Sequence, residues 1–247
     1  MQFLEIDDVH KDFGGVHALA GVSMQVDEAS VLGLIGPNGS GKSTLLNVIA
    51  GFYKPTRGAV KFRGDRIDGH PPHRIVQLGI AKTHQIPQPF LDMTARENLA
   101  VSVMYGVTRV RNVNRGLEEA DRILSYLGMS RRADVPTSNL TVQEKKRLEL
   151  GKALATGAKI LLLDEIFAGL STSELSESMD LFSKLQKELG FTAVVVEHVM
   201  RAVLGLSNRV VVLVEGRKIV EGSPDEIVRD NRVIEAYVGT RSDVIRT

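Results

Sequence analysis

The stretch from Gly36 to Ser43 reads GPNGSGKS and satisfies the pattern G-x-x-x-x-G-K-[ST] in full. In such a stretch the glycines let backbone N–H groups turn inward around phosphate oxygens, and a helix beginning at the lysine adds the positive end of its dipole. The residues expected to cradle the phosphates are Gly36, Pro37, Asn38, Gly39, Ser40, Gly41, Lys42, Ser43 and Thr44. Within this set Lys42 is expected to reach the β- and γ-phosphates, and Ser43 to bind Mg²⁺ through its hydroxyl. Thr44 is placed to reach the α-phosphate.

A second candidate group is a pair of carboxylates that ends an apolar run, in Leu161-Leu-Leu-Asp164-Glu165. Open α/β sheets bind ligands at the carboxyl ends of their strands, which is where this pair falls. Asp164 is expected to hold Mg²⁺, directly or through water, and Glu165 to orient or deprotonate an attacking water. Alone, the motif is equally compatible with a strand that exits into an acidic turn. Beside a phosphate-binding loop, it predicts hydrolysis of the bound nucleotide.

Short apolar runs predict the elements that position these residues. Val31–Gly36 has the continuous hydrophobicity of a strand buried on both faces, and Leu45–Phe52 has the spacing of a packed helix. The alternative, a glycine-rich turn that carries Lys-Ser by chance, does not require this strand–loop–helix context. Three further strands are predicted at Ile160–Glu165, Ala193–His198 and Arg209–Gly216. A helix is predicted at Ser173–Leu189, and a hairpin turn at Glu215-Gly216. This order predicts an α/β fold with a mostly parallel, helix-covered sheet.

A helical insertion is predicted to interrupt this core. Thr94-Ala-Arg-Glu97 has the pattern of a capping box at a helix start. Beyond it, apolar residues recur at intervals of three and four, as in Leu117, Ala120, Ile123, Leu124 and Leu127. The predicted organisation is one domain over residues 1–247, with an α/β core (1–85 and 157–247) and a helical subdomain (86–156).

Composition narrows the classes of function. The 31 basic and 30 acidic residues leave a formal net charge of +1, so nucleic acid is not expected as a partner. The chain has no cysteine, which excludes disulfides and thiolate metal sites and fits a reducing, cytosolic setting. The longest apolar runs fall short of the roughly 20 residues that cross a bilayer, so any membrane role is expected to depend on a partner.

With these motifs in place, the chain resembles the nucleotide-binding subunits of ABC transporters over nearly its whole length. The resemblance implies a P-loop core with an antiparallel β region at the N-terminus and an inserted helical subdomain that carries a signature helix. It also implies ATP and Mg²⁺ as ligands. Gln85, in GIAKTHQ, matches the family's glutamine that contacts Mg²⁺ and the attacking water, and His198, in VVVEH, matches its switch histidine at the γ-phosphate. A glutamine at a domain seam and a structural histidine are the alternatives for these two residues.

An aromatic residue near the N-terminus stacks on adenine in this family. Phe13, in KDFGGVHAL, is the matching residue, with Val16 as an apolar neighbour. Phe13 in the hydrophobic core is the alternative. Phrases outside the nucleotide site further resemble the ATPases of branched-chain amino-acid transporters and related urea-type systems: FGGVHAL, GIAKTHQ, EHVMRAVLGLSNRVVVL and EGSPDEIVRDNRVIEAYVG.

The segment that matches the family signature departs from it. The usual L-S-G-G-Q is replaced by Leu140-Thr-Val-Gln-Glu144, which loses both glycines and gains a carboxylate. Thr141 keeps the hydroxyl that, by resemblance, contacts the γ-phosphate of ATP held by the opposite subunit. Thr141-x-x-Glu144 is also a capping box, which stabilises a helix start by about 1 kcal/mol. We therefore expect this signature to bind ATP in trans more weakly than the usual one, and Glu144→Gln to strengthen ATP-driven pairing.

The function that the resemblance implies is energy coupling in an importer for branched-chain amino acids or a similar small solute. The expected partners are a second, identical or related, ATP-binding subunit, transmembrane permease subunits and, indirectly, a solute-binding protein. The expected location is the cytoplasmic face of the membrane. An ABC ATPase that acts on nucleic acid or ribosomes is one alternative, although tandem cassettes and long coiled-coil insertions are absent from this sequence. A P-loop kinase is another, and Gln85, the signature helix and His198 argue against it.

Overall fold

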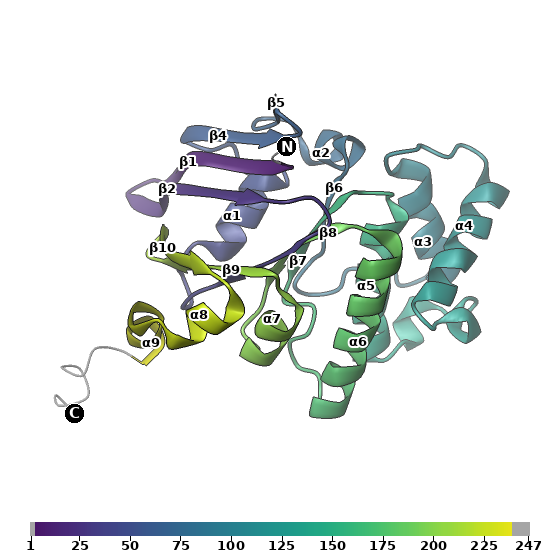
Figure 1. The fold of residues 1–247 in the computed structure, drawn as a ribbon. Helices are drawn as coiled ribbons and strands as arrows, with labels where there is room; N and C mark the ends of the chain where they lie inside the picture. The colour runs from purple at the N-terminus through teal and green to yellow at the C-terminus, as the bar shows by residue number, and fades with distance from the viewer. Residues whose placement is uncertain (1–2, 239–247) are drawn as a thin grey trace. The chain divides into compact units, whose positions relative to one another are not determined.

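The protein is described by a computed structural model that covers residues 3–238. Gly239, the last residue of the C-terminal phrase noted above, therefore lies outside the described residues. The chain divides into two compact units. The first unit comprises residues 1–70 and 193–247, and the second comprises residues 71–192. Figure 1 labels the helices and strands of both units.

Two sheets build the first unit. The antiparallel sheet has the order β2-β1-β4-β5, with bounds Leu4–Phe13 (β1), Val16–Val26 (β2), Arg57–Phe62 (β4) and Asp65–Arg66 (β5). In the other, β3 lies parallel to both β8 and β9, and β10 pairs antiparallel with β9. The bounds are Val31–Ile35 (β3), Thr192–Val196 (β8), Arg209–Val214 (β9) and Arg217–Gly222 (β10). The parallel strands are as the sequence pattern predicts, and the antiparallel N-terminal region is as the resemblance implies.

Helices cover both sides of these parallel strands in the first unit. Their bounds are Lys42–Ile49 (α1), Met200–Leu206 (α7), Pro224–Arg229 (α8) and Asn231–Val238 (α9). In Figure 1, α1 lies beneath the antiparallel sheet, and α7 and α8 lie beneath β9. Every residue of β3 and β8 is buried, which is the expected consequence of cover on two faces. A buried cluster joins β3 and β9 to α7, α8 and α9: Ile35, Val203, Val210, Val212, Ile227 and Val233.

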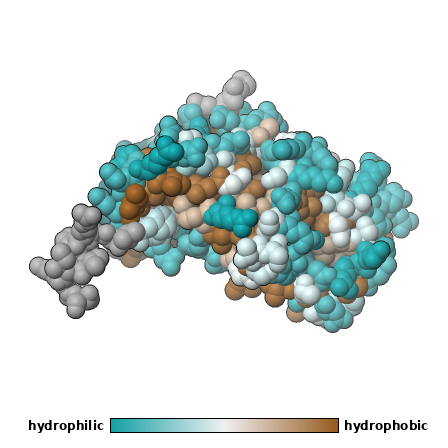
Figure 2. Space-filling model, turned by 60° about the horizontal axis from the view of Figure 1, so that its bottom comes forward, coloured by the Kyte–Doolittle hydropathy of each residue, from teal (hydrophilic) through white to brown (hydrophobic). Residues whose placement is uncertain are grey.

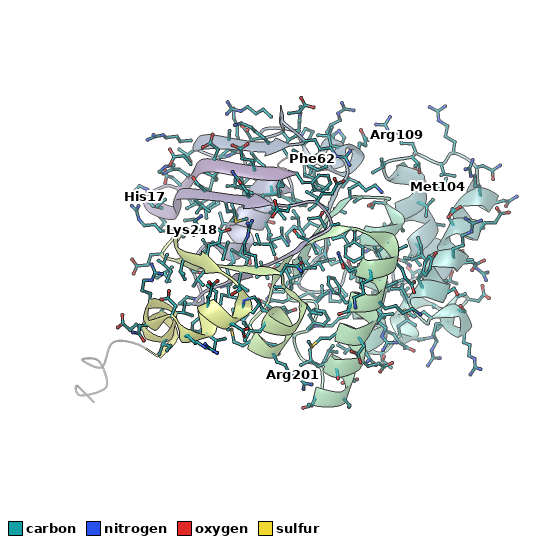
Figure 3. The ribbon with its side chains drawn as sticks, viewed as in Figure 1. His17, Phe62, Met104, Arg109, Arg201 and Lys218 are labelled. Atoms are coloured by element: carbon teal, nitrogen blue, oxygen red, sulfur yellow. The ribbon has the colours of Figure 1, made fainter. Side chains whose placement is uncertain are left out.

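The second unit combines a parallel strand pair with helices. Its elements are Pro72–Leu78 (α2), Ile80–Lys82 (β6), Ala95–Tyr105 (α3), Val113–Tyr126 (α4), Val142–Ala155 (α5), Ile160–Asp164 (β7) and Thr172–Leu189 (α6), with 3-10 turns at Ser130–Arg132 and Thr137–Asn139. The predicted capping box at Thr94 and Glu97 is confirmed. Figure 1 shows α3 and α4 side by side, and the residue labels of Figure 3 place Met104 at the end of α3.

Hydrophobic side chains reach the surface in both units. On the face drawn in Figure 2, hydrophobic surface gathers toward the middle and hydrophilic surface borders it. The most exposed large apolar side chains in the described range include Ile86 (75%), Tyr105 (74%) and Val16 (66%). None of the helices found within residues 3–238 is both long enough and apolar enough to span a bilayer.

Candidate functional site

The phosphate-binding loop lies between β3 and α1, as predicted. Gly36 follows β3 with a φ of 147°, and a Cβ at this position would collide with the carbonyl oxygen of Leu213. Gly41 caps α1 with a φ of 101°, and its Cβ would lie 2.6 Å from the carbonyl oxygen of Ala18. Both positions therefore require glycine, because a side chain would be strained and would also collide with backbone.

The lysine of the loop is folded back over it. Lys42 is 6% exposed, and its Nζ donates to the carbonyl oxygens of Gly36 (2.7 Å) and Pro37 (2.8 Å). The first hydrogen bond of α1 runs from the Leu45 N–H to the Gly41 carbonyl, so the N–H groups of Ser43 and Thr44 precede it. No acidic residue lies in the first turn of α1. Backbone donors, the helix dipole and one ammonium thus gather at a single end of the helix, which is an anion-binding arrangement.

Phe13 lies at the tip of the β1–β2 hairpin, not in the core. The residue is 43% exposed, and its ring meets that of Tyr53 edge-on, with the ring centroids 5.1 Å apart. Lys11 Nζ lies 4.9 Å from the centroid of the Phe13 ring. Val16 is also exposed on this hairpin, and Figure 3 labels His17 beside it. The core alternative for Phe13 is therefore wrong, and Tyr53 is an aromatic neighbour that sequence reasoning missed.

His198 follows the carboxyl end of β8 within the first unit. Strand β8 pairs in parallel with β3, and Leu34 of β3 lies opposite Val196 of β8. Carboxyl ends of parallel neighbours meet at the same edge of a sheet, so His198 and the phosphate-binding loop share that edge. His198 is exposed there, whereas Glu197 before it is buried.

The two carboxylates occur where β7 ends, in the second unit. Asp164 is 3% exposed, and its Oδ2 accepts a hydrogen bond from Lys82 Nζ at 3.1 Å. Its Oδ1 is buried and has no hydrogen-bond partner within the described range. Buried carboxylate oxygens are normally satisfied, so this oxygen fits a cation ligand. The sequence did not single out Lys82, because one lysine after the two apolar residues Ile80 and Ala81 is a weak signal.

Glu165 and Gln85 come together as a pair. Gln85 Nε2 donates to Glu165 Oε2 at 2.8 Å, because the parallel strands β6 and β7 end side by side. Glu165 has a φ of 53°, an uncommon backbone conformation for glutamate. Such strain costs on the order of 1–3 kcal/mol and is concentrated at functional sites. Lys146 Nζ, on α5, donates to the Glu165 carbonyl oxygen at 3.3 Å and also to that of Ala168.

The altered signature forms the capping box that the sequence predicts. Thr141 Oγ1 accepts from the Glu144 N–H, and Glu144 Oε2 accepts from the Thr141 N–H at 2.9 Å. The other carboxylate oxygen, Oε1, accepts from Arg132 Nε at 2.6 Å. Burial acts to raise the pKa of Glu144, but the hydrogen bonds from Thr141 and Arg132 outweigh it and hold that pKa below its usual value. The negative charge of Glu144 is therefore maintained and is offset by Arg132.

The ion pair with Arg132 is expected to limit the repulsion between Glu144 and ATP. In a Glu165→Gln background, Arg132→Ala is expected to weaken ATP-driven pairing severalfold, because it leaves the Glu144 charge uncompensated beside an incoming triphosphate. Adding Glu144→Gln to Arg132→Ala is expected to restore most of the loss. Sedimentation equilibrium in ATP measures the pairing constant.

Arg131→Ala is the matched control, since Arg131 is the neighbouring exposed arginine and has no ion pair recorded among the described residues. Equal pairing constants for Arg131→Ala and Arg132→Ala would show that Arg132 has no role in offsetting Glu144.

The predicted site residues fall in both units. Those in the first unit are Phe13, Val16, the loop residues 36–44 and His198; those in the second are Gln85, Thr141, Asp164 and Glu165. Within units, the structure brings together the loop and His198 at one strand edge, and Gln85 with Glu165 at another.

Comparison with known proteins identifies the class. The chain matches the ABC transporter family over residues 19–168, and a branched-chain amino acid ATP-binding cassette transporter family over residues 217–243. It therefore belongs to the ATP-binding proteins of ABC transporters, and it is an ATPase. The capacity to bind nucleotide belongs to this class.

Individual relatives are similar over nearly their whole length. The high-affinity branched-chain amino acid transport ATP-binding protein BraF of Pseudomonas aeruginosa is 34% identical, over 96% of this chain and 97% of its own. A probable branched-chain amino acid transport ATP-binding protein, LivG of Archaeoglobus fulgidus, is 34% identical over 99% and 98%.

Solved structures share the fold. An ABC-transporter ATP-binding cassette in its ADP conformation matches with a TM-score of 0.87, 33% identity, and coverage of 97% of this chain and 99% of its own. A dimeric cassette in a post-hydrolysis state, bound to ADP and Pi, matches with a TM-score of 0.79 and 25% identity, over 90% of this chain and 99% of its own.

Proposed function

We propose that this chain powers the uptake of branched-chain amino acids, or of a similar small solute, as the ATP-hydrolysing subunit of an importer. The observation that carries the proposal is similarity to branched-chain amino acid transport ATP-binding proteins over nearly the whole chain. The match of residues 217–243 to a branched-chain family adds support from outside the phosphate-binding loop. Both relatives described above are named for transport, so the alternative role on nucleic acid or ribosomes gains no support.

In this proposal the residues 36–44 cradle the ATP phosphates. Lys42 exchanges its carbonyl contacts for the β- and γ-phosphates, while the N–H groups at the start of α1 bind phosphate oxygens. Phe13 stacks on adenine with Val16 beside it, since its ring is already exposed on a hairpin and supported by Tyr53. His198 contacts the γ-phosphate from the neighbouring strand end.

Mg²⁺ is proposed to be held by Asp164, Ser43 and Gln85. The buried Oδ1 of Asp164 supports this role because it has no donor of its own. Within residues 3–238, no group of three or more His, Asp or Glu side chains is arranged so that it could hold a metal ion by itself. Mg²⁺ bound to nucleotide needs only one or two carboxylates with phosphate oxygens. The metal ion would neutralise charge on the transferred phosphoryl group.

Glu165 is proposed as the base that takes a proton from the attacking water. Gln85 holds the carboxylate through its Nε2, which fixes the orientation of Oε2. The strained backbone at Glu165 supports a role in positioning rather than in packing. The chemistry is then ATP and water to ADP and phosphate, with charge stabilisation supplied by Lys42 and His198.

Two such subunits, identical or related, are proposed to bind two ATP molecules between them. Each ATP would contact the loop of one subunit and Thr141 of the other. The dimeric cassette with bound ADP and Pi supports this arrangement, because it matches this chain over most of its length. ATP binding would favour the closed pair, and hydrolysis the open one, so differential affinity drives the cycle.

Permease subunits are proposed to dock on one group of exposed apolar side chains in the second unit, near the start of α3. Ile86, Phe90 and Leu91 are 75%, 54% and 54% exposed. The backbone of Phe90 is held by the buried Asn98, whose side chain accepts from the Phe90 N–H and donates to the Phe90 carbonyl oxygen. Exposed apolar side chains that group together are typical of a protein-binding surface. Docking would place the chain at the cytoplasmic face of the membrane, with a solute-binding protein as an indirect partner.

Phe90→Ala is expected to reduce co-purification with coexpressed branched-chain amino acid permease subunits by tenfold or more, since an exposed aromatic anchor carries much of a binding energy. ATP affinity of the chain alone is expected to be unchanged. Tyr105→Ala, a second exposed aromatic in the same unit, is the control. Co-purification of Phe90→Ala at the wild-type level would contradict docking at this surface.

The solute is tested by reconstitution. Vesicles that contain the chain, the permease subunits and a solute-binding protein are expected to accumulate labelled leucine when ATP is supplied on the side of the chain. Accumulation of a chemically different solute, such as urea, without leucine would replace the proposed substrate class. ATP hydrolysis that no solute stimulates would contradict the transport role itself.

A further inference from the structure

The C-terminal helix α9 is fixed to the strands of the first unit. Val233 is 5% exposed and packs in the cluster that contains Ile35 and Val212. Arg232 Nη1 donates to the carbonyl oxygen of Ile219 on β10 at 3.1 Å, and its Nη2 pairs with Asp230 at 2.6 Å. In Figure 1, α9 lies next to α8, below β10. The helix therefore has a defined position relative to β3, the strand that leads into the phosphate-binding loop.

One side chain of α9 reaches that loop directly. Tyr237 Oη accepts a hydrogen bond from the Gly36 N–H at 2.8 Å, across 201 residues of sequence. Ile35, just before, is still paired with Val212 of β9, whereas Gly36 turns the chain away from the strand. A buried backbone N–H that leaves a sheet needs another acceptor. The Tyr237 hydroxyl provides it at the first residue of the loop.

The other polar group of Gly36 is held from inside the loop. Its carbonyl oxygen accepts from Lys42 Nζ at 2.7 Å. Under the function proposed above, Lys42 also serves the phosphates, so the hold on this carbonyl changes when nucleotide binds. The contact from Tyr237 comes from outside the loop and is independent of that exchange.

We propose that Tyr237 is a positioning residue for ATP binding: its hydroxyl fixes the first peptide of the phosphate-binding loop in the conformation that accepts nucleotide. The inference rests on the proposed nucleotide site and adds to it a residue from the C-terminal helix. Without the hydroxyl, the loop occupies its binding conformation for only part of the time. Apparent affinity then falls by that fraction, while the rate of the chemical step in bound protein is unchanged.

Tyr237→Phe is the test, because it removes the hydroxyl and keeps the ring. We expect KM for ATP and the dissociation constant of a fluorescent ADP analogue to rise about fivefold, with kcat within about twofold of wild type. We also expect faster hydrogen–deuterium exchange at the Gly36 amide in protein without nucleotide. Tyr105→Phe, the same change on an exposed ring of the second unit, is the control and is expected to alter none of these.

An unchanged exchange rate at Gly36, or an unchanged ADP affinity, overturns the inference. A fall in kcat with KM unaltered overturns it as well, because it would place Tyr237 in the chemical step or in general stability. The exchange measurement needs no nucleotide, so it is separate from the proposed function. If wild-type protein fails to bind ADP, the proposed nucleotide site is wrong; if wild type binds ADP and Tyr237→Phe binds it equally well, only this inference fails.

Discussion

ATP hydrolysis by the purified chain is expected to fall by about 100-fold or more in Glu165→Gln, with ATP binding retained. General-base catalysis contributes on the order of 10²–10⁴ in rate, and glutamine cannot take the proton from water. The substitution preserves the shape of the side chain, and its amide group can still hydrogen-bond with Gln85 after a rotation of that amide. Steady-state phosphate release and equilibrium binding of ATP measure the two effects separately.

Glu215→Gln is the matched control for this substitution. Glu215 is also a glutamate in the left-handed conformation, with a φ of 48°, but it is exposed in the turn between β9 and β10. The Glu215→Gln protein is expected to hydrolyse ATP at the wild-type rate. Normal turnover by Glu165→Gln would remove Glu165 from the proposed chemistry and leave its strained backbone without a functional reason.

Lys42→Ala is expected to weaken ATP and ADP binding by about 100-fold or more. The ammonium is the one side-chain cation of the loop, and charge-assisted hydrogen bonds to two phosphates are worth more than neutral ones. Hydrolysis at any fixed, subsaturating ATP concentration should fall at least as far. Calorimetric titration with ADP measures binding without turnover.

Lys187→Ala is a suitable control, since Lys187 is an exposed lysine near the end of α6. The thermal unfolding of both variants must also be measured, because Lys42 donates hydrogen bonds to the carbonyl oxygens of Gly36 and Pro37 and its loss could destabilise the loop. A folded Lys42→Ala protein that binds ADP with wild-type affinity would contradict the assignment of this loop as the phosphate site.

Local patterns predicted much of this fold correctly. The strands β3, β7, β8 and β9 are continuous apolar runs, and such runs are diagnostic when a strand is buried on both faces. The hairpin at Glu215-Gly216 is confirmed by the antiparallel pairing of β9 with β10. The helix predicted from Ser173 to Leu189 begins one residue earlier, at Thr172, because Ser171 caps it.

Elements with weaker patterns were not assigned from sequence. The short helices α2, α7 and α8 have six or seven residues each, too few for a helical period to emerge. The predicted helical region begins at residue 86, but its first helix starts at Ala95. The intervening segment is held by long-range hydrogen bonds, such as that from the Gln88 N–H to Glu149, which leave no periodic trace in sequence.

For the site too, the sequence indicated residues within local motifs but not the contacts between residues far apart in the chain. Motif spacing led to the phosphate-binding loop, Asp164 and Glu165, because each lies directly beside a recognisable strand. Contacts between residues far apart in the chain carry no such signal, as with Lys82 and Asp164 or Gly36 and Tyr237. The ion pair between Glu144 and Arg132 is a further case, because the signature motif shows the carboxylate but not the arginine that offsets its charge.

ATP-driven pairing of two such subunits is tested most directly by the solution mass of Glu165→Gln, measured with ATP, with ADP and without nucleotide. We expect a mass close to the 27.0 kDa of one chain without nucleotide or with ADP, and about twice that with ATP. A protein that binds ATP but keeps the mass of one chain would contradict pairing of two copies through the loop and the signature helix.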